Sequence, residues 1–512
     1  MLAKDLEKLA FKIAMAAFFV LFGLSAVFLA VGSRHAAESL ADASFWVGLA
    51  GAFLRLALDL GGRTAARDIP GAGGPRAWPG DLLVIVLLGL IPLLWFKQGT
   101  LIGGVDFDMP LFPVEQFHLR KYTWNPVFLG GMDYSPRISG LFTFTAFQAG
   151  ARALGLDLSI VQRLYFVFWY TLSGLSMYFM MCNLVRGRDA VSGVARMGAV
   201  ILYMVNFYQL HIWMIARKGE LCGYIIIPAS IGLIAAASEK RIRFRTLFFA
   251  ATLVYFIGSG IGTNPPIIGI FFMAVVACVC FLAIAQALRE GRVIRPAGRA
   301  LAIGGLLIGA FFLVNFHWIL PFVNFIVQAQ FLDIEKTRDV FALKELLETT
   351  SRHNSLLNVM RMYGDSNFFD GFKGVCYMPF FPSYEKSAAL VLGSFLFPFL
   401  AYGGLRATSH PFAGFFGFLL VVSTFMGKGI HAPFGDLFLW VYQHVPGFWV
   451  YRAPWQKFGI LMTVAYAFLA GLCCSSAYAF FSRRKKAGTA LRPGQYQALG
   501  LVPVITILAA VL

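Results

Sequence analysis

Long apolar stretches separated by short polar segments run along almost the whole chain. A helix that crosses a bilayer needs about 20 consecutive apolar residues, with a range of about 17–25 when it tilts. By this measure the pattern predicts about thirteen transmembrane helices, and therefore an all-α, polytopic membrane protein. The expected spans are residues 9–31, 43–60, 81–97, 161–184, 190–209, 221–238, 247–262, 265–288, 300–322, 387–404, 411–426, 456–481 and 497–512.

The second of these spans carries two charged residues, Arg55 and Asp59. Residues four apart lie on the same face of a helix, so the two side chains can form an ion pair. We expect such a pair near the end of the span. The alternative is a functional charge within the membrane.

The composition agrees with this pattern. The chain of 512 residues is 59% hydrophobic and 13% charged, whereas a soluble domain is about 45–50% apolar and about 25% charged. These values exclude a soluble enzyme, a disordered protein and a secreted disulfide-rich scaffold.

The net charge of +18 comes from 43 Lys and Arg against 25 Asp and Glu. Such an excess can attract nucleic acid, but in membrane proteins Lys and Arg also collect in cytoplasmic loops. With Met1 inside, and with Arg196, Lys97 and Lys457 counted with the segments that adjoin their spans, the inner segments carry 22 basic against 6 acidic residues and the outer ones 18 against 17. The excess therefore reflects topology, nucleic acid is excluded as a partner, and the long segments 98–160, 323–386 and 427–455 lie outside.

A linker rich in Gly and Pro, residues 69–80, divides the chain. It separates an N-terminal helix pair with a basic linker, residues 1–80, from a larger membrane domain, residues 81–512. We expect the first span to stay as an anchor rather than be cleaved. The last apolar run is short for a span, so we expect the natural chain to continue beyond Leu512.

The first long outer loop holds the strongest candidates for chemistry. Asp106 and Asp108 follow directly on a span, where two carboxylates could bind a divalent cation or raise the pKa of one of them to that of a base. Trp124 could stack on a sugar ring. The alternative is an ordinary polar loop, in which Asp caps a turn. After this loop, residues 138–155 are amphipathic, and we expect a helix lying in the outer interface. Its apolar contacts should come from Phe142, Phe144, Phe147 and Leu154, and Gln148 and Arg152 should stay in polar surroundings.

Two further segments place charges at the outer ends of spans. Arg217, Lys218 and Glu220 begin one span, and Arg452 and Lys457 precede another. Arg and Lys bind phosphate well, so these cations could hold a lipid-linked phosphate. The alternative is that their side chains only anchor helices at the interface.

The order of these motifs resembles that of the GT-C membrane glycosyltransferases, in particular the N-terminal domain of the α-(1→3)-arabinofuranosyltransferase type. The resemblance covers roughly residues 81–512. It rests on GGVDFDMPLFP (Gly103–Pro113), WNPVFLGG (Trp124–Gly131), VQRLYF (Val161–Phe166), the segment Glu220–Pro228, and PGFWVYRAPWQKF (Pro446–Phe458).

This resemblance implies an inverting glycosyltransferase of the cytoplasmic (inner) membrane with its active face outside. The donor would be a polyprenyl-phosphate sugar, the acceptor a glycan or lipid, and Asp106 or Asp108 the catalytic base or the ligand of Mg, Mn or Ca. It further implies that Glu220, Arg452 and Lys457 surround the site, and no residue defines the sugar. Two other classes stay open: a lipid-linked oligosaccharide flippase or transporter, and an O-antigen-type polymerase or ligase.

Overall fold

The computed structural model describes residues 2–60, 79–103, 109–126, 131–214, 216–327 and 340–486. Within these ranges the protein is almost entirely helical, and its sheet consists of two antiparallel ladders of two-residue strands. In the first ladder, β1 (Trp124–Asn125) pairs with β2 (Met132–Asp133), with Trp124 opposite Asp133. In the second, β3 (Gly371–Phe372) pairs with β4 (Val375–Cys376).

The α-helices in the described ranges are α1 (Leu2–Ala30), α2 (Arg34–Leu60), α3 (Pro79–Gly89), α4 (Pro113–Arg120), α5 (Ala146–Ala153), α6 (Leu158–Leu184), α7 (Ala190–Met204), α8 (Phe207–Met214), α9 (Lys218–Ser238), α10 (Phe244–Ile257), α11 (Pro265–Glu290), α12 (Ile294–Val327), α14 (Val340–Ser351), α15 (Leu356–Met360), α16 (Phe381–Lys386), α17 (Ala388–Ser394), α18 (Leu396–Ala407), α19 (Ala413–Gly427), α20 (Gly435–His444) and α21 (Pro454–Lys486). Shorter helical turns are η1 (Ile91–Trp95), η2 (Ser135–Gly140), η3 (Leu141–Thr145), η4 (Ser259–Thr263), η5 (Ser366–Phe368) and η6 (Phe448–Tyr451).

Nine helices in the described ranges are long and apolar enough to cross a membrane, which confirms a multi-pass membrane protein. Three further apolar helices are shorter and lie at Pro79–Trp95, Phe244–Ile257 and Ala413–Gly427. Twelve of the thirteen expected spans therefore coincide with apolar helices, but only nine of these reach the usual length. The thirteenth, residues 497–512, lies outside the described residues.

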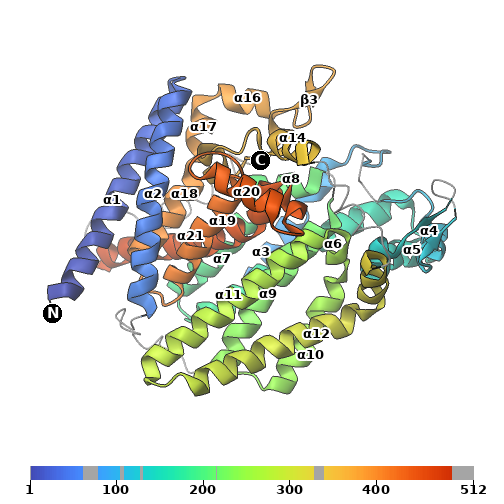
Figure 1. The fold of residues 1–512 in the computed structure, drawn as a ribbon, viewed down its shortest axis with the longest axis horizontal. Helices are drawn as coiled ribbons and strands as arrows, with labels where there is room; N and C mark the ends of the chain where they lie inside the picture. The colour runs from blue at the N-terminus through green and yellow to red at the C-terminus, as the bar shows by residue number, and fades with distance from the viewer. Residues whose placement is uncertain are drawn as a thin grey trace.

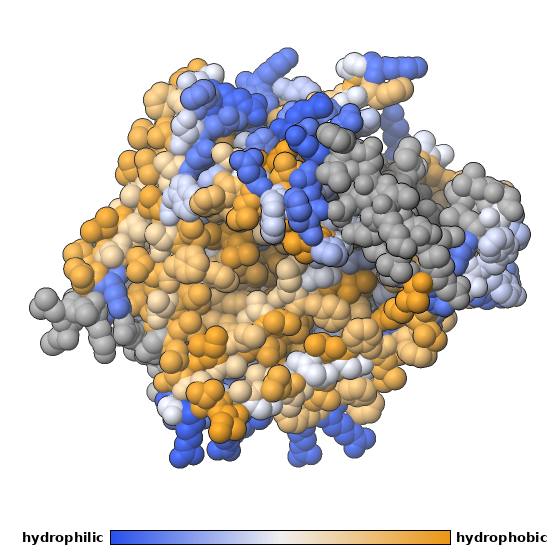
Figure 2. Space-filling view, viewed as in Figure 1, coloured by the Kyte–Doolittle hydropathy of each residue, from blue (hydrophilic) through white to orange (hydrophobic). Residues whose placement is uncertain are grey.

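The helices form a bundle in which α9 and α21 are central and α1, α11 and α12 are peripheral (Figure 1). The most apolar stretch of α9 is buried throughout, whereas only 28% of that of α1 or α12 is buried. Figure 2 shows the consequence: apolar side chains cover a broad belt, with polar residues above and below it. Such a belt is what lipid tails contact, so membrane lipids surround the protein.

The N-terminal helix pair packs onto this bundle through α2 and α19. Arg55 and Asp59 form the ion pair expected from their spacing, with 3.1 Å between Nε and Oδ1. Arg55 also donates from Nη1 to the carbonyl of Thr408 over 2.7 Å, and Asp59 accepts from the backbone N–H of Gly414, also over 2.7 Å. Both charges are thus paired and tied to a later part of the chain.

Polar contacts join segments that the charge pattern assigns to the same side. On the inner side, Arg241 donates to Asn183 and Arg299 to the carbonyl of Ala237. On the outer side, Asn264 donates to Glu220, and Thr350 donates to the carbonyl of Arg452. These contacts support the alternation of crossings, while the identity of the outer side stays a prediction.

The segment 138–155 is helical but bent rather than one interfacial helix. It comprises part of η2, the π-helical turn η3 and the eight-residue α5, which packs against α4 and α6. Phe144 is fully buried and stacks on Trp169. The expectation of polar surroundings for Gln148 is wrong, because Gln148 lies one turn after Phe144 and is buried with it. Leu154, expected to make apolar contacts, is 83% exposed.

Candidate functional site

The candidate site is built around the short helix α8, which begins at a break after α7. Asn206 stabilises this break. Its amide nitrogen donates to the carbonyls of Leu202 and Tyr203, and its oxygen accepts from the backbone N–H of Gln209 over 2.8 Å. The chain therefore ends one helix and starts the next without leaving these backbone groups unpaired.

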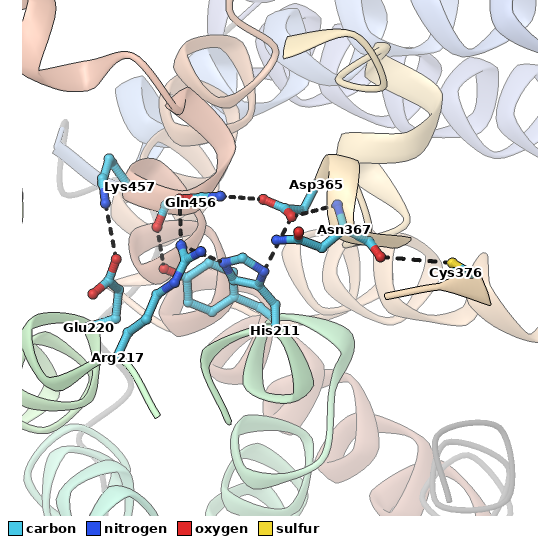
Figure 3. A network of polar contacts seen from close by, with 9 residues as sticks. His211, Arg217, Glu220, Asp365, Asn367, Cys376, Gln456 and Lys457 are labelled. Atoms are coloured by element: carbon cyan, nitrogen blue, oxygen red, sulfur yellow. Dashed lines mark hydrogen bonds and ion pairs between the residues drawn. The ribbon is translucent and has the colours of Figure 1, made fainter. Parts of the chain in front are cut away.

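A buried ion pair ties the beginning of α9 to the beginning of α21 (Figure 3). The ammonium of Lys457 lies 3.0 Å from Oε1 of Glu220, and the two side chains are only 9% and 1% exposed. Asn264, at the start of α11, donates to the same oxygen over 2.7 Å. Burial of a charge is costly unless it is paired and hydrogen-bonded, and here both conditions are met.

A second set of contacts continues from this pair into the loop after α15. Arg217 donates from Nη1 to Oε1 of Gln456, and Gln456 donates from Nε2 to Oδ2 of Asp365 over 2.7 Å. Nδ1 of His211 lies 3.5 Å from Oδ1 of Asp365, and Nε2 of the same ring lies 3.3 Å from Nη1 of Arg217. Four segments far apart in sequence thus meet in one network, which we call the polar cluster: His211, Arg217, Glu220, Asn264, Asp365, Gln456 and Lys457. Figure 3 labels all of these residues except Asn264.

Asp365 is buried, yet it is kept ionised by its neighbours. Burial by itself raises the pKa of a carboxyl group. His211, the charge of Arg217, and hydrogen bonds from the backbone N–H of Asn367 and from Gln456 outweigh this and hold the pKa of Asp365 below its ordinary value. Asp365 therefore acts as a fixed negative charge at the centre of the polar cluster.

The charges in the polar cluster are not equivalent. Lys457 and Glu220 neutralise each other directly. Arg217 is only partly buried, and its described hydrogen-bond partners are Gln456 and His211, neither of which is an acid. A guanidinium has five N–H donors, so Arg217 is the cation in the cluster best able to accept an added anion.

The opposite side of α8 faces a cavity of about 610 Å³. Gln209, Leu210 and Trp213 line this cavity, whereas Tyr208 and His211 point to the polar cluster. Spacings of three and four residues place side chains on one face of a helix, which explains this division. One short helix thus separates an apolar cavity from a group of buried charges.

The root of the first outer loop is fixed at the wall of this cavity. Ile102 lines the cavity, and two hydrogen bonds to Gln162 hold the backbone of Ile102. The N–H of Ile102 donates to Oε1 of Gln162 over 2.9 Å, and Nε2 of Gln162 donates to the carbonyl of Ile102 over 2.6 Å. Asp106 and Asp108, the predicted catalytic or metal-binding pair, follow four and six residues later and lie outside the described residues. Within the described ranges, no group of three or more His, Cys, Asp and Glu side chains could hold a metal ion.

The other predicted site residues do not all join the polar cluster. Trp124 is 57% exposed, and its indole packs on Gly131, where a Cβ would approach within 2.5 Å of the ring. Lys218 is buried, with its ammonium 5.5 Å from the centre of the Phe144 ring. Arg452 is exposed, and its carbonyl accepts the hydroxyl of Thr350. The structure therefore brings together Arg217, Glu220 and Lys457 from the predicted set.

Sequence reasoning missed four members of the polar cluster: His211, Asn264, Asp365 and Gln456. All lie in segments that the charge pattern places outside, and Gln456 stands next to Lys457. Asn264 stands directly before the two prolines that begin α11, and its amide binds Glu220. No local pattern marks Asp365 as a member, because its partners within the polar cluster are 91 and more residues away.

Comparison with protein-family models, with curated proteins and with solved structures gave no match, so the GT-C resemblance rests on the sequence motifs alone.

Proposed function

We propose that the protein is a membrane glycosyltransferase that moves a sugar from a polyprenyl-phosphate donor to a glycan or lipid acceptor outside the cytoplasm. One observation carries the proposal. The root of the loop that bears Asp106 and Asp108 lies at an apolar cavity, and α8 lines this cavity with one face and contributes His211 to the polar cluster with the other. An amphiphilic donor requires this combination of apolar wall, cation and carboxylate.

In this proposal Asp106 or Asp108 removes the proton from the acceptor hydroxyl as it attacks the sugar. A carboxylate placed about 2.6–3.2 Å from the hydroxyl raises the rate about 10²–10⁴-fold. The alternative role is that both carboxylates bind Mg, Mn or Ca, which would supply positive charge for the leaving phosphate. Arg217 would stabilise the same charge.

Among the cations that the sequence offers for a phosphate, Arg217 is a better ligand than Lys457 or Arg452. Lys457 is engaged by Glu220 at 3.0 Å, so binding an anion would mean disrupting a buried pair. Arg217 could bind a phosphate oxygen while keeping its contact with Gln456, because the guanidinium presents several donors. Glu220 then holds Lys457 and positions the start of α9.

The test is sugar transfer by purified Asp106→Asn and Asp108→Asn variants, measured with a panel of polyprenyl-phosphate sugars. We expect transfer to fall at least about 10²-fold in one of them. Asp133→Asn is a matched control in the same loop, because Asp133 accepts from the backbone N–H of Ser135. Loss of activity in a chelator would favour the metal role. Near-normal transfer in both Asp variants would overturn the catalytic assignment in favour of a flippase or a polymerase.

A further inference from the structure

The cavity beside α8 contains buried polar groups without partners among the described residues. Gln209 is 2% exposed, and both atoms of its side-chain amide lack a hydrogen bond there. The indole N–H of Trp213 and the phenol oxygen of Tyr384 also lack a hydrogen bond among the described residues. These two residues are 4% and 5% exposed. All three side chains line the cavity. Because buried polar groups are nearly always hydrogen-bonded in folded proteins, these groups point to a ligand.

The three groups together offer both kinds of hydrogen bond. The amide nitrogen of Gln209 and the indole of Trp213 donate, the amide oxygen of Gln209 accepts, and the phenol of Tyr384 does both. A hydroxyl group also donates and accepts, so it can satisfy Gln209 at both ends of its amide. An ether or ketone offers no donor and would leave the oxygen of Gln209 unpaired.

The rest of the wall defines the remainder of the ligand. Aromatic and aliphatic side chains such as Trp95, Phe166, Phe207 and Leu390 dominate it, and among the described residues that line it none is charged. A phosphate or carboxylate would lose its hydration without gaining a counter-ion here. Asn206 and Ser383 also line the cavity, but the amide of Asn206 is already engaged by backbone groups. A free sugar would therefore leave several of its hydroxyls unpaired, and each unpaired one is unfavourable. The wall therefore fits an apolar chain with one or two hydroxyls.

We propose that this cavity binds an uncharged lipid alcohol. Its hydroxyl lies at Gln209 and Trp213, which stand one turn apart on α8, and its chain lies along the aromatic wall to which Tyr384 also belongs. The chain can be a straight alkyl chain or a branched prenyl chain, which share this chemistry. This is the cavity that the proposed function assigns to the prenyl chain of the donor, so the alcohol and the donor would compete for it. The experiment measures binding of the alcohol alone and does not depend on sugar transfer.

The experiment is photo-cross-linking of the full chain in nanodiscs with octadecanol that carries a diazirine in its chain. We expect labelling of peptides that contain residues 204–214 and 378–390. Unlabelled octadecanol should compete at least about tenfold better than octadecane, which corresponds to 1.4 kcal/mol, and better than stearate. Geranylgeraniol serves as a second competitor, and its strength relative to octadecanol shows whether the cavity prefers a prenyl or an alkyl chain. Stronger competition by either alcohol than by octadecane supports the proposal.

Gln209→Leu should lower labelling by octadecanol about tenfold while octadecane competes as before. Replacing an unpaired amide by an apolar group of similar size removes an unfavourable burial, so this variant should fold. Gln286→Leu is the matched control, because Gln286 donates to the carbonyl of Ser238 at the other end of the bundle. Equal competition by octadecanol and octadecane, or unchanged labelling in Gln209→Leu, would show that water satisfies these groups and would overturn the proposal. Preference for stearate would overturn it as well.

Discussion

Lys457 on α21 reaches Glu220 on α9 across 3.0 Å in an almost fully buried ion pair. The two residues are 237 positions apart, and each stands in the first turn of its helix. An acidic residue is favourable in a first turn and a basic one is not. The pairing therefore explains how Lys457 is tolerated at the start of a buried helix, and it fixes two central helices to each other.

The first prediction concerns this pair. Lys457→Met should lower the free energy of unfolding by about 3–5 kcal/mol, because it leaves the charge of Glu220 buried and unpaired. Glu220→Gln should destabilise similarly, whereas the double variant should lose much less than the sum. Thermal unfolding in one detergent measures all four proteins of the cycle. Additive losses would mean that the two side chains do not interact.

The general architecture could be predicted from the sequence because lipid imposes a simple rule. Every backbone polar group in the hydrocarbon region needs an internal partner, so apolar segments become helices. Twelve expected spans coincide with apolar helices for this reason. The exact ends of the helices could not be predicted as well. For example, α7 stops at Met204 because Asn206 caps a new helix there, and hydropathy does not detect such a break.

Only part of the candidate site could be predicted from the sequence. Arg217, Glu220 and Lys457 stood out as outer charges next to spans, and the charge pattern placed them on one side. Asp365 and His211 could not be found this way, because an isolated charge in a long loop or a single His in an apolar helix has no distinctive pattern. Only the tertiary fold brings their side chains within 3.5 Å.

The second prediction tests how the N-terminal helices are held. A Cβ on Gly414 would lie 2.6 Å from the Cα of Leu56 and 2.8 Å from Oδ2 of Asp59, where α2 and α19 touch. Gly414→Ala should therefore destabilise the protein by about 1–3 kcal/mol through overpacking. The control is Gly305→Ala, because a Cβ on Gly305 in α12 meets nothing within 4 Å. That variant should be neutral or stabilised by up to about 1 kcal/mol, and both are measured by thermal unfolding. An equal effect at both positions would refute the close contact.

The third prediction concerns pH. His410 lies between α18 and α19, donates from Nε2 to the carbonyl of Leu184 over 3.1 Å, and accepts from the backbone N–H of Phe412 at Nδ1. Burial lowers its pKa to about 4, with smaller contributions from Arg55 and Arg186 and against the hydrogen bond to Leu184. The unfolded chain, with an ordinary pKa of about 6.5, binds a proton first. The stability contributed by neutral His410 is thus complete above pH 6.5 and is lost as the pH falls towards 4.

We expect the unfolding temperature of the wild type to fall between pH 6.5 and 4. The fall should be smaller in His410→Gln, which keeps a donor and an acceptor but does not titrate in this range. His444→Gln is a control, because His444 contacts the carbonyl of Trp440 in its own exposed helical turn. Identical profiles for the wild type and His410→Gln would show that another group controls the acid response.

The fourth prediction concerns topology. Lys386 at the end of α16 and Arg245 in the first turn of α10 are both exposed and belong to segments assigned to opposite sides. A membrane-impermeant maleimide added to intact cells should label Lys386→Cys well above the parent chain and leave Arg245→Cys unlabelled until the cells are opened. The reverse pattern would invert the assignment of sides that the Lys and Arg distribution predicts.

The last prediction separates the phosphate ligand from the structural pair. Arg217→Gln should weaken the binding of polyprenyl phosphate by at least about tenfold, because a charge-assisted hydrogen bond contributes about 1.5–3 kcal/mol. Arg217→Lys keeps a positive charge near Asp365 but loses the planar fork, so it should fold normally and bind with intermediate affinity. Lys457→Met should show the opposite profile. The single variant should lose much stability, and the double variant Glu220→Gln, Lys457→Met, which is more stable, should bind polyprenyl phosphate with nearly normal affinity. Binding is measured by competition for a labelled polyprenyl phosphate in nanodiscs. If the double variant at Glu220 and Lys457 loses as much affinity as Arg217→Gln, the ion pair itself binds the phosphate and Arg217 is not the distinguishing cation.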